Sequence, residues 1–183
     1  MLVKAAEDKI NEINRRLELR KEFKGPKVLL MAELFLVMAA GLYLLKMILV
    51  SGDLSAQGDD RILSLLMFGV NILMMILAMH AAFGVSSKRI SSWCTVVRNC
   101  GLLFIMSTLT YFTQIRLDMG ADVTFDPILA GIIAIPVIII MLLPSVREFY
   151  MPPMAEKKPL VNWILCLFGI GMYSSDEYEL KYD

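Results

Sequence analysis

The stretch VLLMAELFLVMAAGLYLLKMILV, residues 28–50, decides the fold class because it is almost entirely apolar. A helix of roughly 20 apolar residues covers the hydrocarbon core of a bilayer, which is about 30 Å thick. Three more apolar runs follow, at residues 62–85, 96–115 and 127–143. Each of them approaches or exceeds the length of a span. We therefore predict an all-α fold, a polytopic membrane bundle of four transmembrane helices.

The composition fits this class of protein. Hydrophobic residues make up 57% of the chain and the mean hydropathy is +0.64, whereas soluble domains are about 45–50% apolar. Lys and Arg together equal Asp and Glu at 18 each, so the net charge gives no reason to expect nucleic acid as a partner. Three cysteines cannot all pair, and no disulfide framework is expected.

The charges between the apolar runs alternate in sign. Residues 1–27 hold eight Lys and Arg, and the other basic segments contain Lys88, Arg89 and Arg98, then Arg147, Lys157 and Lys158. The two remaining connections are acidic, through Asp53, Asp59 and Asp60 and through Asp118, Asp122 and Asp126. By the positive-inside rule, the basic segments face the cytoplasm. We predict a multi-pass protein of the cell membrane with a cytoplasmic N-terminus.

These boundaries divide the chain into three parts. Residues 1–27 are predicted to form a cytoplasmic amphipathic arm, which lies on an anionic leaflet, extends as a solvated helix or docks on the loops of this protein. Residues 28–144 form the four-span domain, and 145–183 form a cytoplasmic or interfacial C-terminal segment. Residues 161–172 are apolar but short, so spanning, re-entrant and interfacial arrangements all stay open. Within the spans, Lys46 is expected to extend to the membrane surface, and the hydroxyls of the third run are expected to face the bundle.

The basic loop HAAFGVSSKRISSWC, residues 80–94, holds the candidate chemistry. Cys94 is predicted to begin the third helix, with Ser91 and Ser92 as N-cap candidates. The positive end of the helix dipole and the charges of Lys88 and Arg89 would favour a thiolate. Cys94 is thus a candidate nucleophile, or alternatively a small apolar residue at a helix start.

His80 is the only histidine of the chain and is predicted to lie near the end of the second span. It is a candidate general base for Cys94 if the loop folds back. The alternatives are a histidine that bonds to a neighbouring helix and one that extends to the lipid headgroups. The sequence contains no Gly-rich phosphate loop, metal-ligand cluster or carboxylate pair within an apolar run. We therefore expect no metal and no cofactor.

The order of these features resembles a family, the accessory gene regulator B (AgrB) membrane cysteine endopeptidases of Gram-positive quorum sensing. The resemblance covers roughly residues 60–160. Its parts are two spans, then a Gly-containing basic loop that ends in a cysteine, FGVSSKRISSWC, then two more spans and, after them, a proline motif. That motif reads YMPPMAEKKP here, with Tyr150, Pro152, Lys157 and Pro159 at the family's positions.

The resemblance implies a cysteine peptidase that cuts a short amphipathic propeptide and holds the fragment as a thioester. Cys94 would be the nucleophile, and Lys88 and Arg89 would bind the peptide. The family's loop histidine, however, is replaced by Ser86 or Ser87, depending on the alignment, and serine cannot act as a base at neutral pH. The chain is then a degenerate relative, a variant that has lost the histidine, or an enzyme in which His80 has taken the role.

Two function classes follow from the sequence. The first is an AgrB-like protein that processes a quorum-sensing propeptide, with its catalytic activity left open. The alternative is a small non-enzymatic membrane protein: a transporter subunit, a holin-like protein or an assembly factor. The expected partners are the propeptide and the lipid bilayer, with a homodimer left open and no nucleic acid.

Overall fold

All regular structure in the described part of the chain is helical. The computed structural model describes residues 10–11, 26–53, 59–116, 121–151 and 158–170. The six helices in these ranges are α2 (Lys27–Asp53), α3 (Asp59–Val85), α4 (Ile90–Arg116), α5 (Ala121–Leu142), α6 (Pro144–Tyr150) and α7 (Leu160–Leu167). The all-α prediction is confirmed. Most of the predicted amphipathic arm, 1–27, lies outside the described residues.

Three helices are long and apolar enough to cross a membrane by themselves. Their spanning parts are Lys27–Ile48, Leu65–Val85 and Ile90–Thr113. A fourth span results if α5 and α6 are counted as one broken span, whose halves Gly131–Leu142 and Pro144–Tyr150 meet at 73°. These helices indicate a membrane-associated protein.

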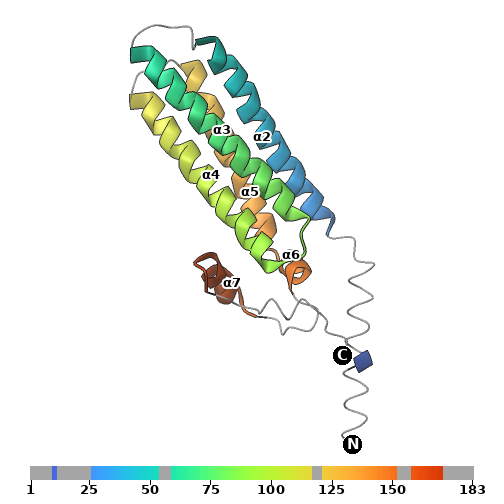
Figure 1. The fold of residues 1–183 in the computed structure, drawn as a ribbon. Coiled ribbons are helices and arrows are strands. Elements are labelled where there is room, and N and C mark those ends of the chain that lie inside the picture. The colour runs from blue at the N-terminus through green and yellow to red at the C-terminus, as the bar shows by residue number, and fades with distance from the viewer. Residues whose placement is uncertain (1–9, 12–25, 54–58, 117–120, 152–157, 171–183) are drawn as a thin grey trace, which may run out of the picture.

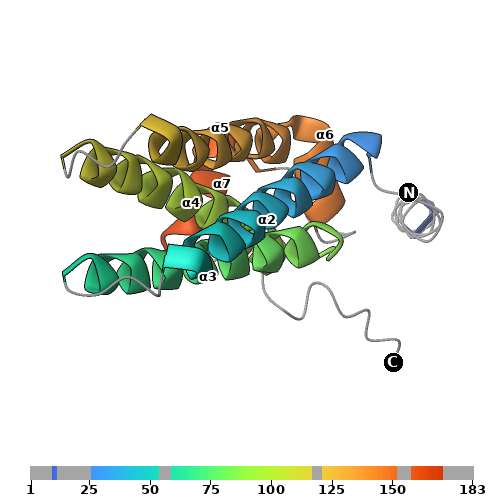
Figure 2. The ribbon, with the colours of Figure 1, turned by 90° about the horizontal axis from the view of Figure 1, so that it is seen from above.

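The helices α2 to α5 pack side by side as an elongated bundle, and each contacts its two neighbours in the order α2, α3, α4, α5 and back to α2 (Figures 1 and 2). The interior is built largely from small and medium side chains, among them Ala32, Ala39, Ala78, Ala81 and Ala134. Small residues let helix backbones approach closely, as membrane helices require. The outer surface carries exposed apolar side chains along all four helices, which suits contact with lipid: Leu30, Leu34, Leu73, Ile76, Ile105, Leu109, Ile132 and Ile139.

Polar side chains inside the apolar helices are arranged partly as predicted. Ser107 of α4 is buried and shares a hydrogen bond of 2.9 Å with the Tyr43 hydroxyl of α2. Thr108 and Thr113 instead donate to the carbonyl oxygen four residues earlier in their own helix, a local bond that satisfies a hydroxyl without a neighbour. Lys46, which was expected to extend to the surface, is only 9% exposed.

The α4 helix begins earlier than the sequence analysis placed it. Ile90 is its first residue, so Ser91, Ser92 and Cys94 lie inside the helix and the loop shrinks to residues 86–89. The prediction of Ser91 or Ser92 as N-cap was therefore wrong. The physical reason is Trp93, which is fully buried and extends the helix's buried face back by one turn.

The C-terminal segment folds onto the end of the bundle that carries this loop (Figure 1). Pro144, at the start of α6, has no N–H to continue α5, and the chain turns there by 73°. The α7 helix has eight residues, about 12 Å of length, so a helical span at Leu160–Leu167 is excluded. It ends with Gly169 at φ 84° and backbone bonds from Gly169 to Cys166 and from Ile170 to Leu165, the pattern of a Schellman motif.

Candidate functional site

Side chains from three elements close the end of the bundle, and we call Trp93, Arg147, Tyr150 and Trp163 the aromatic cap. The last carbonyl groups of a helix have no partner within it. Trp93 Nε1 donates to the carbonyl oxygen of Met141, near the end of α5, at 2.7 Å. This bond from the aromatic cap therefore gives a carbonyl group near the end of α5 the hydrogen-bond donor that its own helix does not supply.

The other cap residues continue this arrangement. The Tyr150 hydroxyl donates to the carbonyl oxygen of Val85, the last residue of α3, at 2.6 Å. Arg147 Nε donates to the Leu142 carbonyl at 3.2 Å, where its positive charge also suits the negative end of the α5 dipole. These bonds fasten α6 to the ends of α3 and α5.

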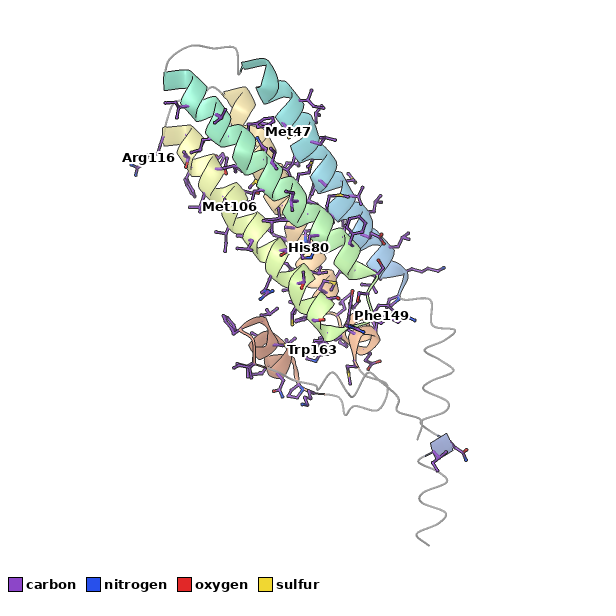
Figure 3. The ribbon with its side chains drawn as sticks, in the orientation of Figure 1. Met47, His80, Met106, Arg116, Phe149 and Trp163 are labelled. Atoms are coloured by element: carbon purple, nitrogen blue, oxygen red, sulfur yellow. The ribbon has the colours of Figure 1, made fainter. Side chains whose placement is uncertain are left out.

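The α7 helix is attached through its one fully buried side chain, Trp163. The Trp163 ring meets the Trp93 ring edge to face, with 5.0 Å between centroids and 74° between planes. The Arg147 guanidinium carbon lies 5.9 Å from the Trp163 centroid, a cation–π distance. Figure 3 places Trp163 against the start of α4. Stacking and charge together hold α7 on the bundle.

Cys94 lies under this attachment. Its side chain is 7% exposed, and its thiol lies 3.0 Å from the Sγ of Cys166 on α7. Both cysteines are free thiols. This partly buried contact between two thiols joins α7 to α4, and the burial of Cys94 leaves it little surface from which to attack a peptide.

His80 belongs to α3 and contacts a side of α4 other than the one that carries Cys94. Its Nδ1 lies 3.2 Å from Nδ2 of Asn99, which is 7% exposed and also donates to the Leu77 carbonyl at 3.3 Å. Successive helix residues are turned by about 100°. The side of α4 that faces His80 carries Ser92, Thr95 and Asn99. Measured around the α4 axis, Cys94 points roughly 130° away from the mean direction of these three residues. The structure does not bring His80 and Cys94 together.

The bond to Asn99 also indicates which ring nitrogen of the neutral imidazole accepts a hydrogen bond. Because Nδ2 of Asn99 donates to the Leu77 carbonyl, its amide nitrogen, and not its oxygen, is the atom beside His80. In neutral histidine one ring nitrogen accepts and the other carries the proton. Nδ1 of His80 is therefore the acceptor, and Nε2 carries a hydrogen that can be donated.

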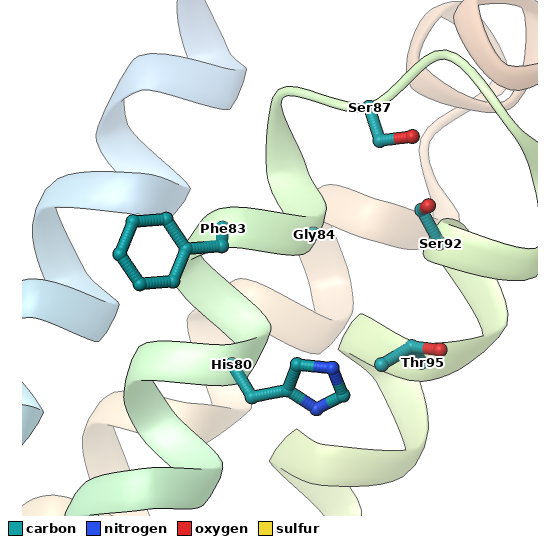
Figure 4. Close-up of a pocket in the computed structure, with 6 residues that line it drawn as sticks. All are labelled: His80, Phe83, Gly84, Ser87, Ser92 and Thr95. Carbon is teal, nitrogen blue, oxygen red and sulfur yellow. The ribbon is translucent and has the colours of Figure 1, made fainter.

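A shallow groove of about 200 Å³ lies between the end of α3 and the start of α4 (Figure 4). Its lining residues are His80, Phe83, Gly84, Ser87, Ser92 and Thr95. Figure 4 shows the His80 ring directed toward α4, with the hydroxyls of Ser87 and Ser92 nearer the loop. A Cβ at Gly84 would lie 2.9 Å from Val96 Cγ2, so glycine is what allows the two helices to meet there.

The remaining predicted site residues lie in the loop. Ser86 is an exposed turn residue and Ser87 is half-buried beside His80 in the groove. Lys88 and Arg89 follow Ser87 in the loop and are exposed. The structure thus groups His80 with Ser87 and separates both from Cys94.

Several residues of this region escaped the sequence analysis. Trp93, Trp163 and Asn99 carry the key contacts. The available signal was that Trp163 and Asn99 are a large and a polar residue within apolar runs, and that Trp93 is a large apolar residue in the basic loop. The proximity of Cys166 to Cys94 could not be predicted across a separation of 72 residues. Within the described residues, no group of three His, Cys, Asp or Glu side chains is placed to hold a metal ion.

Comparison with known proteins adds no relative to this description. No protein-family model, no curated protein and no solved structure matches the chain.

Proposed function

We propose that this chain is a non-enzymatic integral membrane protein that acts as an accessory or assembly subunit in the membrane. In this proposal α2, α3, α4 and α5 all cross the bilayer. The N-terminus and the loop at residues 86–89 face the cytoplasm, because Lys and Arg gather on that side. The α7 helix lies along the membrane surface, with its exposed Val161 and Phe168 in contact with lipid or with a partner subunit.

One observation carries the proposal: Cys94 and His80 are engaged in separate structural contacts on different sides of α4. A cysteine nucleophile needs a base within hydrogen-bond reach and an open side from which substrate can approach. Cys94 instead contacts Cys166 at 3.0 Å and is 7% exposed, while His80 accepts from Asn99. This arrangement supports a structural thiol.

The interior of the bundle favours a structural role over conduction. Between α2 and α4 it is filled by packed Leu36, Met74 and Leu103, which are at most 1% exposed. The Tyr43 hydroxyl and Ser107 satisfy each other. Of the alternatives considered from the sequence, an assembly or accessory subunit agrees better with this packing than a transporter subunit does.

The AgrB-like peptidase stays as a second candidate because Cys94 is the fifth residue of α4, close to the loop. The short α7 contacts it through Cys166, so release of α7 would expose more of the thiol. In that case Lys88 and Arg89 would bind the propeptide, and a partner or a shifted His80 would supply the base.

Co-expression with any short amphipathic peptide that an adjacent reading frame encodes separates the two candidates. We expect mass spectrometry to find no cleaved or cyclised peptide, either from the natural protein or from Ser86→His and Ser87→His variants. A product that disappears in Cys94→Ala but persists in the matched Cys100→Ser control would overturn the proposal in favour of the peptidase.

The membrane orientation has its own test. A cysteine introduced at exposed Ser86 should react with a membrane-impermeant maleimide only after the cells are permeabilised, whereas one at Arg116, at the other end of α4, should react in intact cells. The opposite pattern would invert the topology, and equal labelling would remove α4 as a span.

A further inference from the structure

The thiols of Cys94 and Cys166 form a modification site, which goes beyond the proposed function. We propose that this pair is a redox switch: a low-molecular-weight disulfide oxidises the two thiols to an internal disulfide that holds α7 on the start of α4. In the reduced protein α7 docks reversibly, and its release uncovers Cys94 and the Trp163 ring. The contact between the two sulfur atoms and the small attachment of α7 carry the proposal.

The two sulfur atoms are already in contact across the interface of α4 and α7. They lie 3.0 Å apart, and both cysteines are free thiols. A disulfide bond is about 2.0 Å long, so the sulfurs need to approach by roughly 1 Å. Cys166 belongs to a helix with a single fully buried side chain, Trp163. The α7 helix can therefore make this small movement while the bundle keeps its packing.

The unequal exposure of the two thiols sets the order of the reaction. Cys94 is 7% exposed and Cys166 is half-buried, so a small disulfide reaches Cys166 first. The Cys166 thiolate bonds to one sulfur of that disulfide, and the other half leaves as a thiolate that takes up the proton Cys166 lost. Cys94 then loses its proton and bonds to Sγ of Cys166, and the second half leaves as a thiol. Two protein thiols are oxidised while one small disulfide is reduced to two thiols.

The α7 helix depends on docking for its structure. It has eight residues, whereas isolated helices shorter than about 12–15 residues are marginal in water. Its main contact is the ring of Trp163 against that of Trp93, and other apolar side chains, such as Ile164 and Phe168, stay exposed. Segments with few buried contacts open more readily than the core. One covalent bond between α7 and α4 therefore changes the docked population strongly.

The orientation in the proposed function determines the resting state of the switch. In that orientation the start of α4 faces the cytoplasm, where thiols are kept reduced and disulfides are transient and redox-sensing. The pair is then reduced at rest and is oxidised when the pool of small disulfides rises. This resting state depends on the proposed orientation, whereas the response of the purified protein to an oxidant does not.

Glutathione disulfide, added to the full chain in lipid nanodiscs, tests the switch. Peptide mapping after alkylation identifies the linked cysteines, and hydrogen–deuterium exchange of the amides of Leu160–Leu167 reports the release of α7. We expect a link between Cys94 and Cys166 without retained glutathione. The α7 amides should then exchange about tenfold more slowly, because the link raises the effective concentration of α7 at its docking site. Dithiothreitol should restore the faster exchange.

Variants separate the roles of the two thiols. Cys94→Ala should stop the reaction after its first step, so that Cys166 keeps one glutathione, and Cys166→Ala should leave Cys94 unmodified. The matched control is Cys100→Ala, which removes a fully buried thiol of the same helix and should form the link as the natural protein does. The proposal is overturned if no internal link forms, if Cys100 takes the place of Cys94, or if linked and reduced proteins exchange their α7 amides equally fast.

Discussion

The hydroxyl of Tyr150 offers the sharpest test of how the C-terminal segment is fastened. The side chain is fully buried, and its hydroxyl donates to the Val85 carbonyl at 2.6 Å. Val85, at the end of α3, is 1% exposed, so water cannot replace the bond. Substitution Tyr150→Phe removes the donor while the ring keeps its edge contact with Phe149, whose centroid is 5.1 Å away.

The expected loss of stability arises because the buried Val85 carbonyl loses its hydrogen-bond donor. A buried polar group that loses its partner costs about 1–3 kcal/mol, which is roughly 5- to 150-fold in the equilibrium between docked and undocked α6. The change is confined to the cap because the bundle helices keep all their mutual contacts. Docking of the cap should therefore weaken before the bundle unfolds.

The two tryptophans make the docking of the aromatic cap measurable. The chain has only Trp93 and Trp163, and both belong to the cap. In a titration from mild detergent into SDS, tryptophan fluorescence reports the cap and far-ultraviolet circular dichroism reports the helices. We expect Tyr150→Phe to move the fluorescence transition to lower SDS and the dichroism transition much less. The control is Tyr111→Phe, a half-buried tyrosine whose ring contacts Phe112. The reasoning fails if both variants shift the fluorescence transition equally.

Two further predictions concern the contacts around the cap. Oxidation of the purified protein with peroxide should join Cys94 to Cys166, whose sulfur atoms are 3.0 Å apart. Peptide mapping after alkylation would detect the link, and a failure to form it would contradict the position of α7. Gly84→Ala should destabilise the bundle by roughly 1–3 kcal/mol, because the new Cβ would meet Val96 at 2.9 Å and the packed helices must separate. Gly69→Ala in the same helix has open space and should stabilise by up to about 1 kcal/mol; equal effects in SDS titration would refute the close approach.

The fold was predictable where one physical rule dominates. Long apolar runs specify membrane helices regardless of detail, and the end of α3 at Val85 agrees with its predicted run. The start of α4 was missed because Ser91 and Ser92 have the composition of a helix boundary. The buried Trp93 overrides that local preference through contacts with α5 and α7.

The site was less predictable because its contacts are long-range. The sequence identifies Cys94 and His80 as unusual residues, but only packing reveals their partners. Cys166 is 72 residues from Cys94, and the bond of Asn99 to His80 depends on how α4 is rotated against α3. Rotation about a helix axis is set by the fit of side chains across the interface, which no local pattern specifies.

The reactivity of Cys94 in the intact protein tests the central claim, that this thiol is a structural contact under α7. Alkylation of the natural protein in lipid nanodiscs would be followed for each cysteine by mass spectrometry between pH 6 and 9. We predict that half-buried Cys166 reacts first, that Cys94 stays protected throughout, and that Trp163→Ala releases it. Alkylation of Cys94 ahead of Cys166 at neutral pH would contradict the account and identify Cys94 as an activated nucleophile.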